Sequence, residues 1–326
     1  MDQRDRIGTR LKVRDLDILL AVVELGSMGK AARYLAVSQP VVSRAIAELE
    51  RELGVRLLDR TPQGVEPTVY GRTVVNRGLA VFDELRGSAK DIGFLLNPTK
   101  GELRIGSTQP IAGGLLPAVL DRLNSERPQI AFQVKLGDAA ALHNRDLRER
   151  KVDLLFGRVV DIEEDDVNAE VLFEDRLFVV AGANNPWTRR RKVTLNDLVH
   201  EPWTLPPLDS YAGALAVDAF KASGLATPHI AVAGYGIQLQ NALLSTGRFL
   251  TLFCGSYLKF SGERLGIKAL PIELPIPPRP IGIVTLKNRT PSPLASVFID
   301  CARSLSKPLA AMSAVRKGAS PQHRPR

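Results

Sequence analysis

Apolar positions in the first 53 residues fall into three short stretches with helical spacing. From Leu16 to Leu25 they recur every three or four positions, and Gly26 follows as a helix stop. Ser27 can cap a second helix that runs to Leu35, and Ser38 can cap a third that starts at Gln39-Pro40. An apolar stripe follows the third helix: Val42, Ile46, Leu49 and Leu53. The pattern predicts a unit of three packed helices.

The face beside this stripe carries small and hydrogen-bonding side chains: Pro40, Ser43, Arg44, Ala47 and Arg51. Such a face is typical of a recognition helix that enters a DNA groove. After Gly54, residues 55–58 read as a short strand, and residues 60–68 as a Pro/Gly turn with a second extended piece. Together these elements indicate a winged helix-turn-helix, although any three-helix packing unit can produce similar stripes.

Apolar residues then repeat at alternating steps of three and four, as in the seam of a coiled coil. The seam consists of Val75, Gly78, Phe82, Leu85, Ala89, Ile92 and Leu96. An isolated helix of this length would expose the stripe, so we expect two chains to pair along it. The alternative is a helix packed on its own domain, ended by Asn97-Pro98 before a hinge.

Strand-like and helix-like stretches alternate over the remaining two hundred or so residues. The expected strands are 102–106, 130–134, 153–156, 177–181, 229–233, 249–253 and 280–286, and the expected helices are 115–126, 142–150, 212–223 and 238–246. The first five elements follow the order βαβαβ. This order predicts an α/β fold with a twisted, mainly parallel sheet.

The chain resembles the LysR-type transcriptional regulators. The resemblance is carried by Leu16-Asp17-Ile18-Leu19, Gly26-Ser27, Ala31-Ala32-Arg33-Tyr34-Leu35, Ser38-Gln39-Pro40-Val41-Val42-Ser43-Arg44-Ala45-Ile46, Leu49-Glu50, Leu53-Gly54-Val55-Arg56-Leu57-Leu58-Asp59-Arg60 and Thr68-Val69-Tyr70-Gly71. It implies a winged helix-turn-helix DNA-binding domain at 1–67 and a dimerising linker helix at 68–98. Residues 99–310 would form an effector-binding regulatory domain of two α/β lobes, similar to periplasmic binding proteins of type 2. We expect 311–326 to be a basic, disordered tail.

A few positions depart from the family pattern. Leu58 stands where the family commonly has Phe, and Pro67-Thr68 where it has Leu-Thr. Gln63 stands where a second wing arginine is usual, so it can hydrogen-bond a phosphate but brings no charge. Cys254 replaces a more usual proline.

Groove chemistry assigns roles within the third helix. Arg44 is the best candidate for a guanine edge, Gln39 and Ser43 are adaptable hydrogen-bonding groups, and Pro40 and Val41 can contact a thymine methyl group.

Phosphate contacts are expected from Ser27, Arg33 and Ser38. For Arg60 the resemblance suggests a contact of the wing near the minor groove, and the alternative is a salt bridge to Asp59 or Glu66.

In open α/β sheets, ligands bind beyond the carboxyl ends of strands. The candidate effector-binding residues in such places are Ser107, Thr108, Gln109, Asp138, Arg158, Asp209, Ser210, Tyr235 and Gln238. Arg158 would favour an anionic effector, whereas Asp138 and Tyr235 suit sugar hydroxyls equally well. Organic acids, aromatic acids and sugars therefore all remain open.

The composition, with 44 basic and 35 acidic residues and a net charge of +9, suits a polyanionic partner but does not prove one. Much of this charge lies in the run Arg189-Arg190-Arg191-Lys192 and in the C-terminal tail, both of which read as solvated surface. Cys254 and Cys301 have no neighbouring Cys or His at metal-ligand spacing, so we expect no metal and no cofactor.

Several other functions are disfavoured. The sequence contains no nucleophile elbow or phosphate-binding glycine loop, and its four histidines are scattered, so an enzyme is not expected. A transport solute-binding protein is disfavoured by the winged head and by the polar start, which lacks an apolar leader; we expect a cytoplasmic protein. An effector-free architectural DNA-binding protein is the remaining alternative. The preferred interpretation is a promoter-binding regulator controlled by a small molecule, assembled as a homodimer and then a homotetramer.

Overall fold

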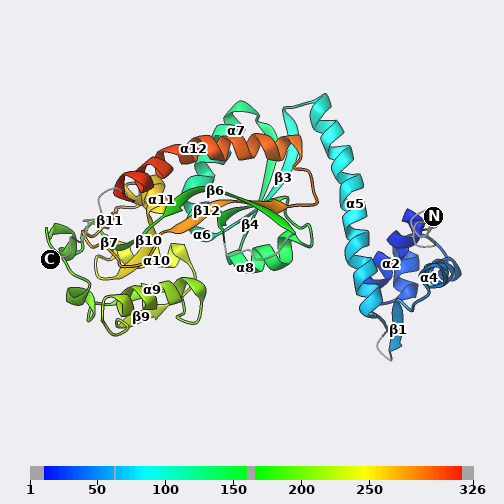
Figure 1. Cartoon of the computed structure of the whole chain (residues 1–326), viewed down its shortest axis with the longest axis horizontal. Helices are drawn as coiled ribbons and strands as arrows, with labels where there is room; N and C mark the ends of the chain where they lie inside the picture. Colours follow the sequence, from blue (N-terminus) through cyan, green and yellow to red (C-terminus); the bar gives the residue numbers. More distant parts are fainter. Residues whose placement is uncertain (1–10, 62–63, 160–165, 318–326) are drawn as a thin grey trace, which may run out of the picture. The chain divides into compact units, whose positions relative to one another are not determined.

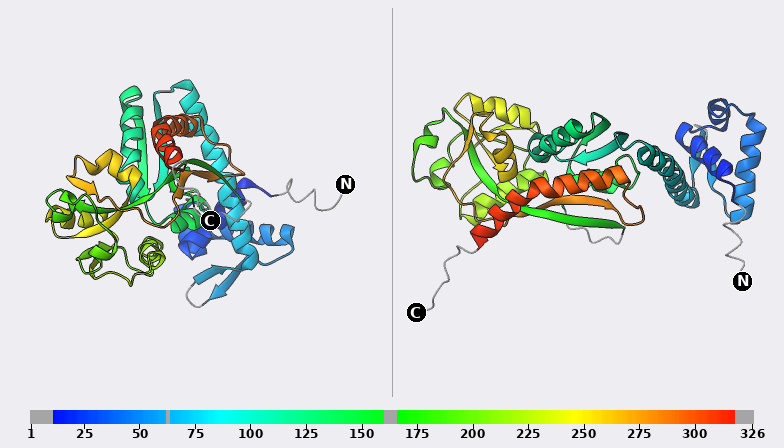
Figure 2. Two further views of the ribbon diagram at one scale, coloured as in Figure 1. Left: turned by 60° about the vertical axis from the view of Figure 1, so that its left-hand side comes forward. Right: turned by 90° about the horizontal axis from the view of Figure 1, so that it is seen from above.

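The computed structural model describes residues 11–61, 64–159 and 166–317 (Figures 1 and 2). Contacts divide the chain into two compact units, Met1–Lys90 and Asp91–Arg326. We call them the head and the C-terminal unit. The boundary falls inside a long helix, within the expected linker 68–98.

The head contains the three predicted helices, α2 (Val13–Leu25), α3 (Met28–Tyr34) and α4 (Gln39–Leu53). Their apolar faces share one core, in which Val42, Ile46 and Leu49 of α4 are buried, as the stripe predicted. Gly26 and Gly54 end α2 and α4 with φ angles of 64° and 71°, the left-handed conformation that glycine adopts without steric cost.

The two serine caps differ. Ser27 Oγ accepts a hydrogen bond from Lys30 N at 3.5 Å and caps α3 as expected. Ser38 was expected to cap α4, but its side chain makes no capping hydrogen bond. The cause is Pro40, which has no N–H to donate, while the Val41 amide donates to the Ser38 carbonyl at 3.0 Å.

The wing is an antiparallel hairpin of β1 (Leu58–Thr61) and β2 (Gly64–Pro67). The first strand starts at Leu58 and not at Val55 as expected, because Leu57 is buried in the head core. The amides of Leu57 and Leu58 instead donate to Glu50 Oε1 at 2.8 and 3.3 Å, which ties the wing to α4.

Gly64 holds the other end of the wing. Its φ of 142° and its position, where a Cβ would clash with the Gly26 carbonyl oxygen, both require glycine. Val65 N donates to the same carbonyl at 3.0 Å. The wing is therefore fixed to the turn between α2 and α3.

Helix α5 (Val69–Leu96) is the predicted long helix. Its first turns pack within the head: Gly78 is buried, and a Cβ there would lie 3.8 Å from the Leu20 side chain. Farther along, Leu85, Ile92 and Leu96 are 53, 59 and 83 % exposed. The seam thus has a packed first part and an open second part.

The C-terminal unit has two lobes, each built on a five-stranded sheet. In the first lobe the strand order is β4 (Gln129–Leu136), β3 (Lys100–Ser107), β5 (Leu154–Arg158), β12 (Arg279–Leu286) and β6 (Val167–Asp175). In the second lobe it is β11 (Ile267–Ala269), β7 (Leu177–Gly182), β10 (Leu250–Cys254), β8 (Trp203–Leu205) and β9 (Ile230–Ala233).

Helices cover both sheets (Figure 1). The first lobe carries α6 (Gln109–Gly113), α7 (Leu115–Glu126) and α12 (Pro293–Lys317), and the second carries α9 (Tyr211–Ala222) and α10 (Ile237–Ser245). In the first core the rings of Phe156 and Phe298 pack edge to face, with their centroids 5.9 Å apart. In the second core the rings of Trp203 and Phe220 do the same, with centroids 5.3 Å apart.

Three expectations for this unit were wrong. The sheets are mixed and not mainly parallel. In the first lobe β12 is antiparallel to β5 and β6, and in the second lobe β7 is antiparallel to β10 and β11. The expected helix 142–150 starts earlier, as α8 (Ala139–Ala141) capped by Asp138, and continues as a π-helical turn, Leu142–Leu147. A turn at Arg150, with φ 57°, then ends it.

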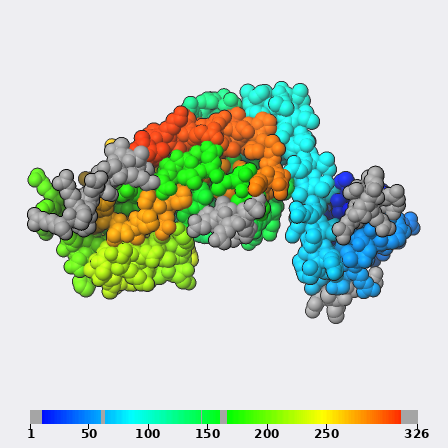
Figure 3. All heavy atoms as spheres, viewed as in Figure 1, coloured from blue at the N-terminus to red at the C-terminus, as the bar shows by residue number. Residues whose placement is uncertain are grey.

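The third error concerns the end of the chain. Helix α12 was not expected, and it reaches Lys317, well into the segment 311–326 predicted to be disordered. It lies along the first lobe, where Figure 3 shows it as a continuous ridge. The helix continues through Pro308, a residue that normally stops one, because its apolar face is anchored in the core on both sides of that residue, by Phe298 and Leu309.

Asp153 joins three segments of the first lobe. Its carboxylate accepts hydrogen bonds from Arg104 N, Nε and Nη2 at 2.9, 3.3 and 2.6 Å, and from Arg289 Nη2 at 3.0 Å. The side chain is only 13 % exposed. Burial alone would raise the pKa of Asp153, but the hydrogen bonds and charge of Arg104 outweigh burial and lower this pKa.

Asp153→Ala should destabilise the C-terminal unit by about 3 kcal/mol, because two largely buried guanidinium groups lose their counter-charge. Since the folded-state pKa is lowered, the stabilisation is complete above the ordinary pKa and is lost as pH falls through the folded value. The gap between wild type and variant should therefore narrow below about pH 4. Thermal unfolding of the full chain over a pH series measures both effects.

Asp300→Ala is the matched control. Asp300 pairs with Arg303, but its side chain is 72 % exposed, so its removal should cost no more than about 0.5 kcal/mol. An Asp153→Ala penalty that equals that of the control, or that persists unchanged into acid, would contradict the assignment.

Candidate functional site

Helix α4 presents a polar face opposite its buried stripe. Gln39, Pro40 and Arg44 are exposed, and Val41 and Ser43 are half-buried beside them. The guanidinium group of Arg44 makes no hydrogen bond or ion pair with any described residue of the chain. The residues selected from the sequence for base contacts thus lie together on one accessible face.

The other DNA-contact candidates of the head are spread over α3, α4 and the wing. Arg33 and Ser38 are exposed, and Ser27 is half-buried with its hydroxyl engaged as a cap. The side chain of Arg60 and the whole of Gln63 lie outside the described residues. Tyr34, 73 % exposed at the end of α3, was not selected from the sequence, and only its unusual exposure marks it.

A cavity of about 420 Å³ opens between the two lobes of the C-terminal unit. Six of the nine predicted effector residues line it: Thr108, Gln109, Asp138, Arg158, Ser210 and Tyr235. Gln109 also bridges the lobes, since its Oε1 accepts a hydrogen bond from Ile237 N at 3.0 Å. We call this cavity the cleft.

The three other predicted residues do not line the cleft. Ser107 is 1 % exposed, and its hydroxyl donates to the Phe156 carbonyl at 2.7 Å, a structural role. Asp209 and Gln238 are exposed outside it. Two residues that do line it also have structural roles: Asp138 Oδ1 accepts from Ala140 N at 2.9 Å, and Ser210 Oγ from Gly213 N at 3.1 Å.

Four polar residues of the cleft were missed from the sequence. Tyr211 lies under the Arg158 guanidinium group, whose central carbon is 3.1 Å from the ring centroid. Gln240 is only 5 % exposed, yet its side-chain amide makes no hydrogen bond with any residue in the described ranges. Arg279 and Asp175 face each other in the β12–β6 register. Their neighbouring places on one sheet face became evident only with the strand pairing.

Asp175 is the centre of a buried cluster at the cleft. Its carboxylate accepts from Ser256 N at 3.2 Å, and Ser256 Oγ lies 3.4 Å from Cys254 Sγ. Burial raises the pKa of Asp175, and the hydrogen bonds from Ser256 and Cys254 offset this only in part. Burial, with the nearby Asp175 charge, also raises the pKa of the Cys254 thiol, which makes it a poor nucleophile.

Charge in the cleft is unevenly distributed. Arg158 and Arg279 supply two cationic groups, whereas the Asp138 carboxylate caps a helix and burial raises the pKa of Asp175. Leu136, Leu205 and Phe253 contribute apolar surface. Within the described ranges, no three His, Cys, Asp or Glu side chains group as a metal site would require, and no helix is long and apolar enough to cross a membrane.

Family models match both units. The model of the bacterial regulatory helix-turn-helix protein, lysR family, matches residues 13–72, and that of the LysR substrate binding domain matches residues 97–307. The transcriptional dual regulator GltC of Bacillus subtilis is 28 % identical over 290 residues, which cover 89 % of this chain and 96 % of the relative. The regulator GbpR of Azospirillum brasilense is 26 % identical over 302 residues, which cover 92 % of this chain and 88 % of that relative.

The fold agrees with solved structures. Full-length CbnR in complex with its target DNA gives a TM-score of 0.61 at 22 % identity, covering 90 % of this chain and all of that one. An OxyR variant of Corynebacterium glutamicum gives 0.55 at 20 % identity, covering 96 % and 97 %.

A winged DNA-binding head and a two-lobed unit with an inter-lobe cleft define a DNA-binding transcriptional regulator that responds to a small-molecule effector. Like these relatives, it is a transcriptional regulator and not an enzyme. The chain belongs to the LysR family of bacterial regulators. The family and the fold expected from the sequence are thereby confirmed.

Ser107→Ala should destabilise the C-terminal unit by about 1–2 kcal/mol, because the buried hydrogen bond to the Phe156 carbonyl is lost. Thermal unfolding of the full chain measures the loss. The cleft itself keeps its lining, so any cleft ligand should bind the variant with unchanged affinity. If Ser107→Ala left stability unchanged but weakened ligand binding, Ser107 would be an effector-binding residue and not a structural one.

Proposed function

We propose that α4 enters the major groove of promoter DNA and that Arg44 reads a guanine edge. The support is its position on the exposed face, among Gln39, Pro40 and Ser43, with no competing protein partner within the described chain. A bidentate arginine contact to guanine is the commonest specific contact in such grooves. Val41 and Pro40 offer apolar contact to a thymine methyl group.

Phosphate contacts flank this reading face. Arg33 and Ser38 are exposed beside it, and Ser27 can still donate its hydroxyl hydrogen while it caps α3. Tyr34 joins this set as a hydroxyl donor. We retain Arg60 as a contact near the minor groove and Gln63 as a phosphate contact on the resemblance alone.

The regulator is proposed to act as a homodimer that assembles into a homotetramer in the cytoplasm. The support is the open part of the seam on α5, where Leu85, Ile92 and Leu96 are largely exposed. Apolar side chains at this spacing are buried when two helices pair. Val75 and Gly78 pack inside the head instead and Phe82 is half-buried, so pairing is assigned mainly to positions from Leu85 onward.

The cleft is proposed to bind a small organic anion with an apolar body. The observation that carries this proposal is Arg279, whose Nε is buried without a hydrogen-bond partner in the described chain. Gln240 also lines the cleft, and its side-chain amide makes no hydrogen bond with a described residue. Buried donors without acceptors are costly, and a carboxylate would satisfy them. Thr108, whose hydroxyl is not engaged with a described residue, can add a further hydrogen bond.

Arg44→Ala should remove about 1–3 kcal/mol of discrimination at one base position and leave the other positions unchanged. Anisotropy titrations of the full chain on a selected operator and its single-base variants measure this. Arg86→Ala, on the exposed surface of α5, is the control and should leave base discrimination intact. Equal weakening by Arg44→Ala on every sequence would mark Arg44 as a phosphate anchor.

Arg279→Ala should abolish the response to effector while it leaves operator binding in the absence of effector unchanged. A thermal-shift screen of the full chain against organic acids and sugars identifies ligands, since a ligand at 100 times its dissociation constant stabilises the fold by about 2.7 kcal/mol. We expect acids to score and the shift to disappear in Arg279→Ala.

Lys221→Ala, exposed on α9 outside the cleft, should keep the full shift. Sugars that shift wild type and Arg279→Ala equally would refute the anion preference. A flat screen on folded protein would favour the effector-free architectural alternative.

A further inference from the structure

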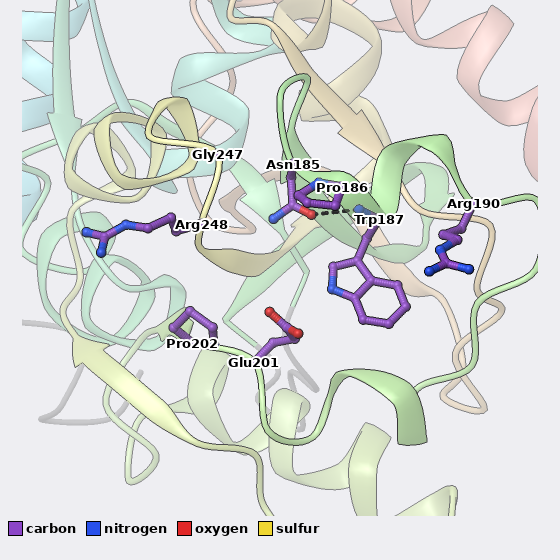
Figure 4. Close-up of a pocket in the computed structure, with 8 residues that line it drawn as sticks. All are labelled: Asn185, Pro186, Trp187, Arg190, Glu201, Pro202, Gly247 and Arg248. Atoms are coloured by element: carbon purple, nitrogen blue, oxygen red, sulfur yellow. Dashed lines mark hydrogen bonds between the residues drawn. The ribbon is translucent and has the colours of Figure 1, made fainter.

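A second pocket, of about 510 Å³, lies in the second lobe, away from the cleft (Figure 4). The cleft uses Leu177 of β7, Leu205 of β8 and Cys254 of β10. The second pocket is formed at the opposite ends of the same strands, by segment 185–190 after β7 and by the residues just before β8 and β10. The effector site therefore does not account for it.

Two polar groups in this pocket, the N–H groups of the buried Asn185 amide and the half-buried Glu201 carboxylate, have no partner among the residues that the structure describes. Asn185 is 1 % exposed; its Oδ1 accepts from Trp187 N at 3.0 Å, but its amide N–H groups donate to no described residue. The half-buried carboxylate of Glu201 makes no hydrogen bond or ion pair with any described residue either. A ligand that offers an acceptor to the Asn185 amide and a donor to the Glu201 carboxylate would satisfy both groups.

Figure 4 shows how these groups lie around an aromatic ring. The Asn185 amide and the Glu201 carboxylate are on the same side of the half-buried Trp187 indole, and Arg190 is on the opposite side. The Arg248 side chain runs away from them. Arg190 belongs to the basic run 189–192, which is exposed throughout.

This arrangement specifies a ligand with three features. A planar ring would stack on Trp187, as nucleic-acid bases do on aromatic side chains. One edge of that ring must place an acceptor for Asn185 beside N–H donors for Glu201. The opposite end must carry negative charge for Arg190.

We propose that this pocket binds a free guanosine nucleotide. The Watson–Crick edge of guanine has the O6 acceptor next to the N1–H and N2–H donors, which matches Asn185 and Glu201 in turn. Adenine would oppose its N1 acceptor to the Glu201 carboxylate. The ribose and phosphates leave the base on the side away from this edge, toward Arg190.

Calorimetric titration of the full chain with GDP, ADP and guanosine tests the proposal. GDP should bind at least about ten-fold more tightly than ADP, because a charge-assisted hydrogen bond is worth more than 1.4 kcal/mol. Glu201→Gln should weaken GDP by about ten-fold and reduce the preference over ADP. Arg190→Ala should weaken GDP but not guanosine.

Arg191→Ala is the matched control, an exposed neighbour of Arg190 that does not line the pocket. It should leave GDP binding unchanged, and Arg279→Ala in the cleft should do the same. No GDP binding at millimolar concentration, equal binding of ADP, or equal losses in Arg190→Ala and Arg191→Ala would overturn the proposal. So would a guanine-rich single strand that binds through these residues more tightly than GDP, because the pocket would then serve nucleic acid.

Discussion

The cleft depends on the contacts made by the buried carboxyl group of Asp175. It ends β6, and after the single residue Arg176 the chain begins β7 of the other lobe. Its hydrogen bond from Ser256 N, 3.2 Å long, ties this crossing to the end of β10. Arg279, in register with Asp175, brings the start of β12 to the same place. Four strand ends from two sheets are thereby fixed around one polar cluster, and the cleft forms between them.

Strand polarity explains which cleft residues could be found from the sequence. Thr108, Gln109 and Arg158 follow or end parallel strands, where ligands are expected, and all three line the cleft. Ser107 precedes Thr108 by one position but is the last residue of β3, where its hydroxyl donates to the Phe156 carbonyl, whereas Thr108 lies beyond the strand at the start of α6. Arg279 was missed because it opens a strand: β12 is antiparallel to β5, so its first residue reaches the edge where β5 ends. Only the pairing of distant strands reveals this.

The linker shows a different limit of sequence reasoning. A three-and-four apolar repeat predicts that a helix face is buried, but it does not say against what. Here Gly78 is buried within the head, whereas Leu96, in the same repeat, is 83 % exposed. Both parts need the same spacing, because the geometry of helix packing is the same within a chain and between chains. The exposed fraction of each side chain distinguishes the part that packs within the head from the part that is open, whereas the periodicity of the repeat does not.

The two pockets differ in what a ligand at each can do. The cleft takes residues from both lobes, so an effector there binds some lobe arrangements better than others, which is the condition for shifting their populations. The second pocket is lined by the second lobe alone, whose strands are joined through fully buried Val179, Leu250 and Trp203. A ligand confined to one closely packed lobe has nearly equal affinity for every lobe arrangement and shifts none of them. Its occupant would therefore act on stability and on the charge of that surface, independently of the switch in the cleft.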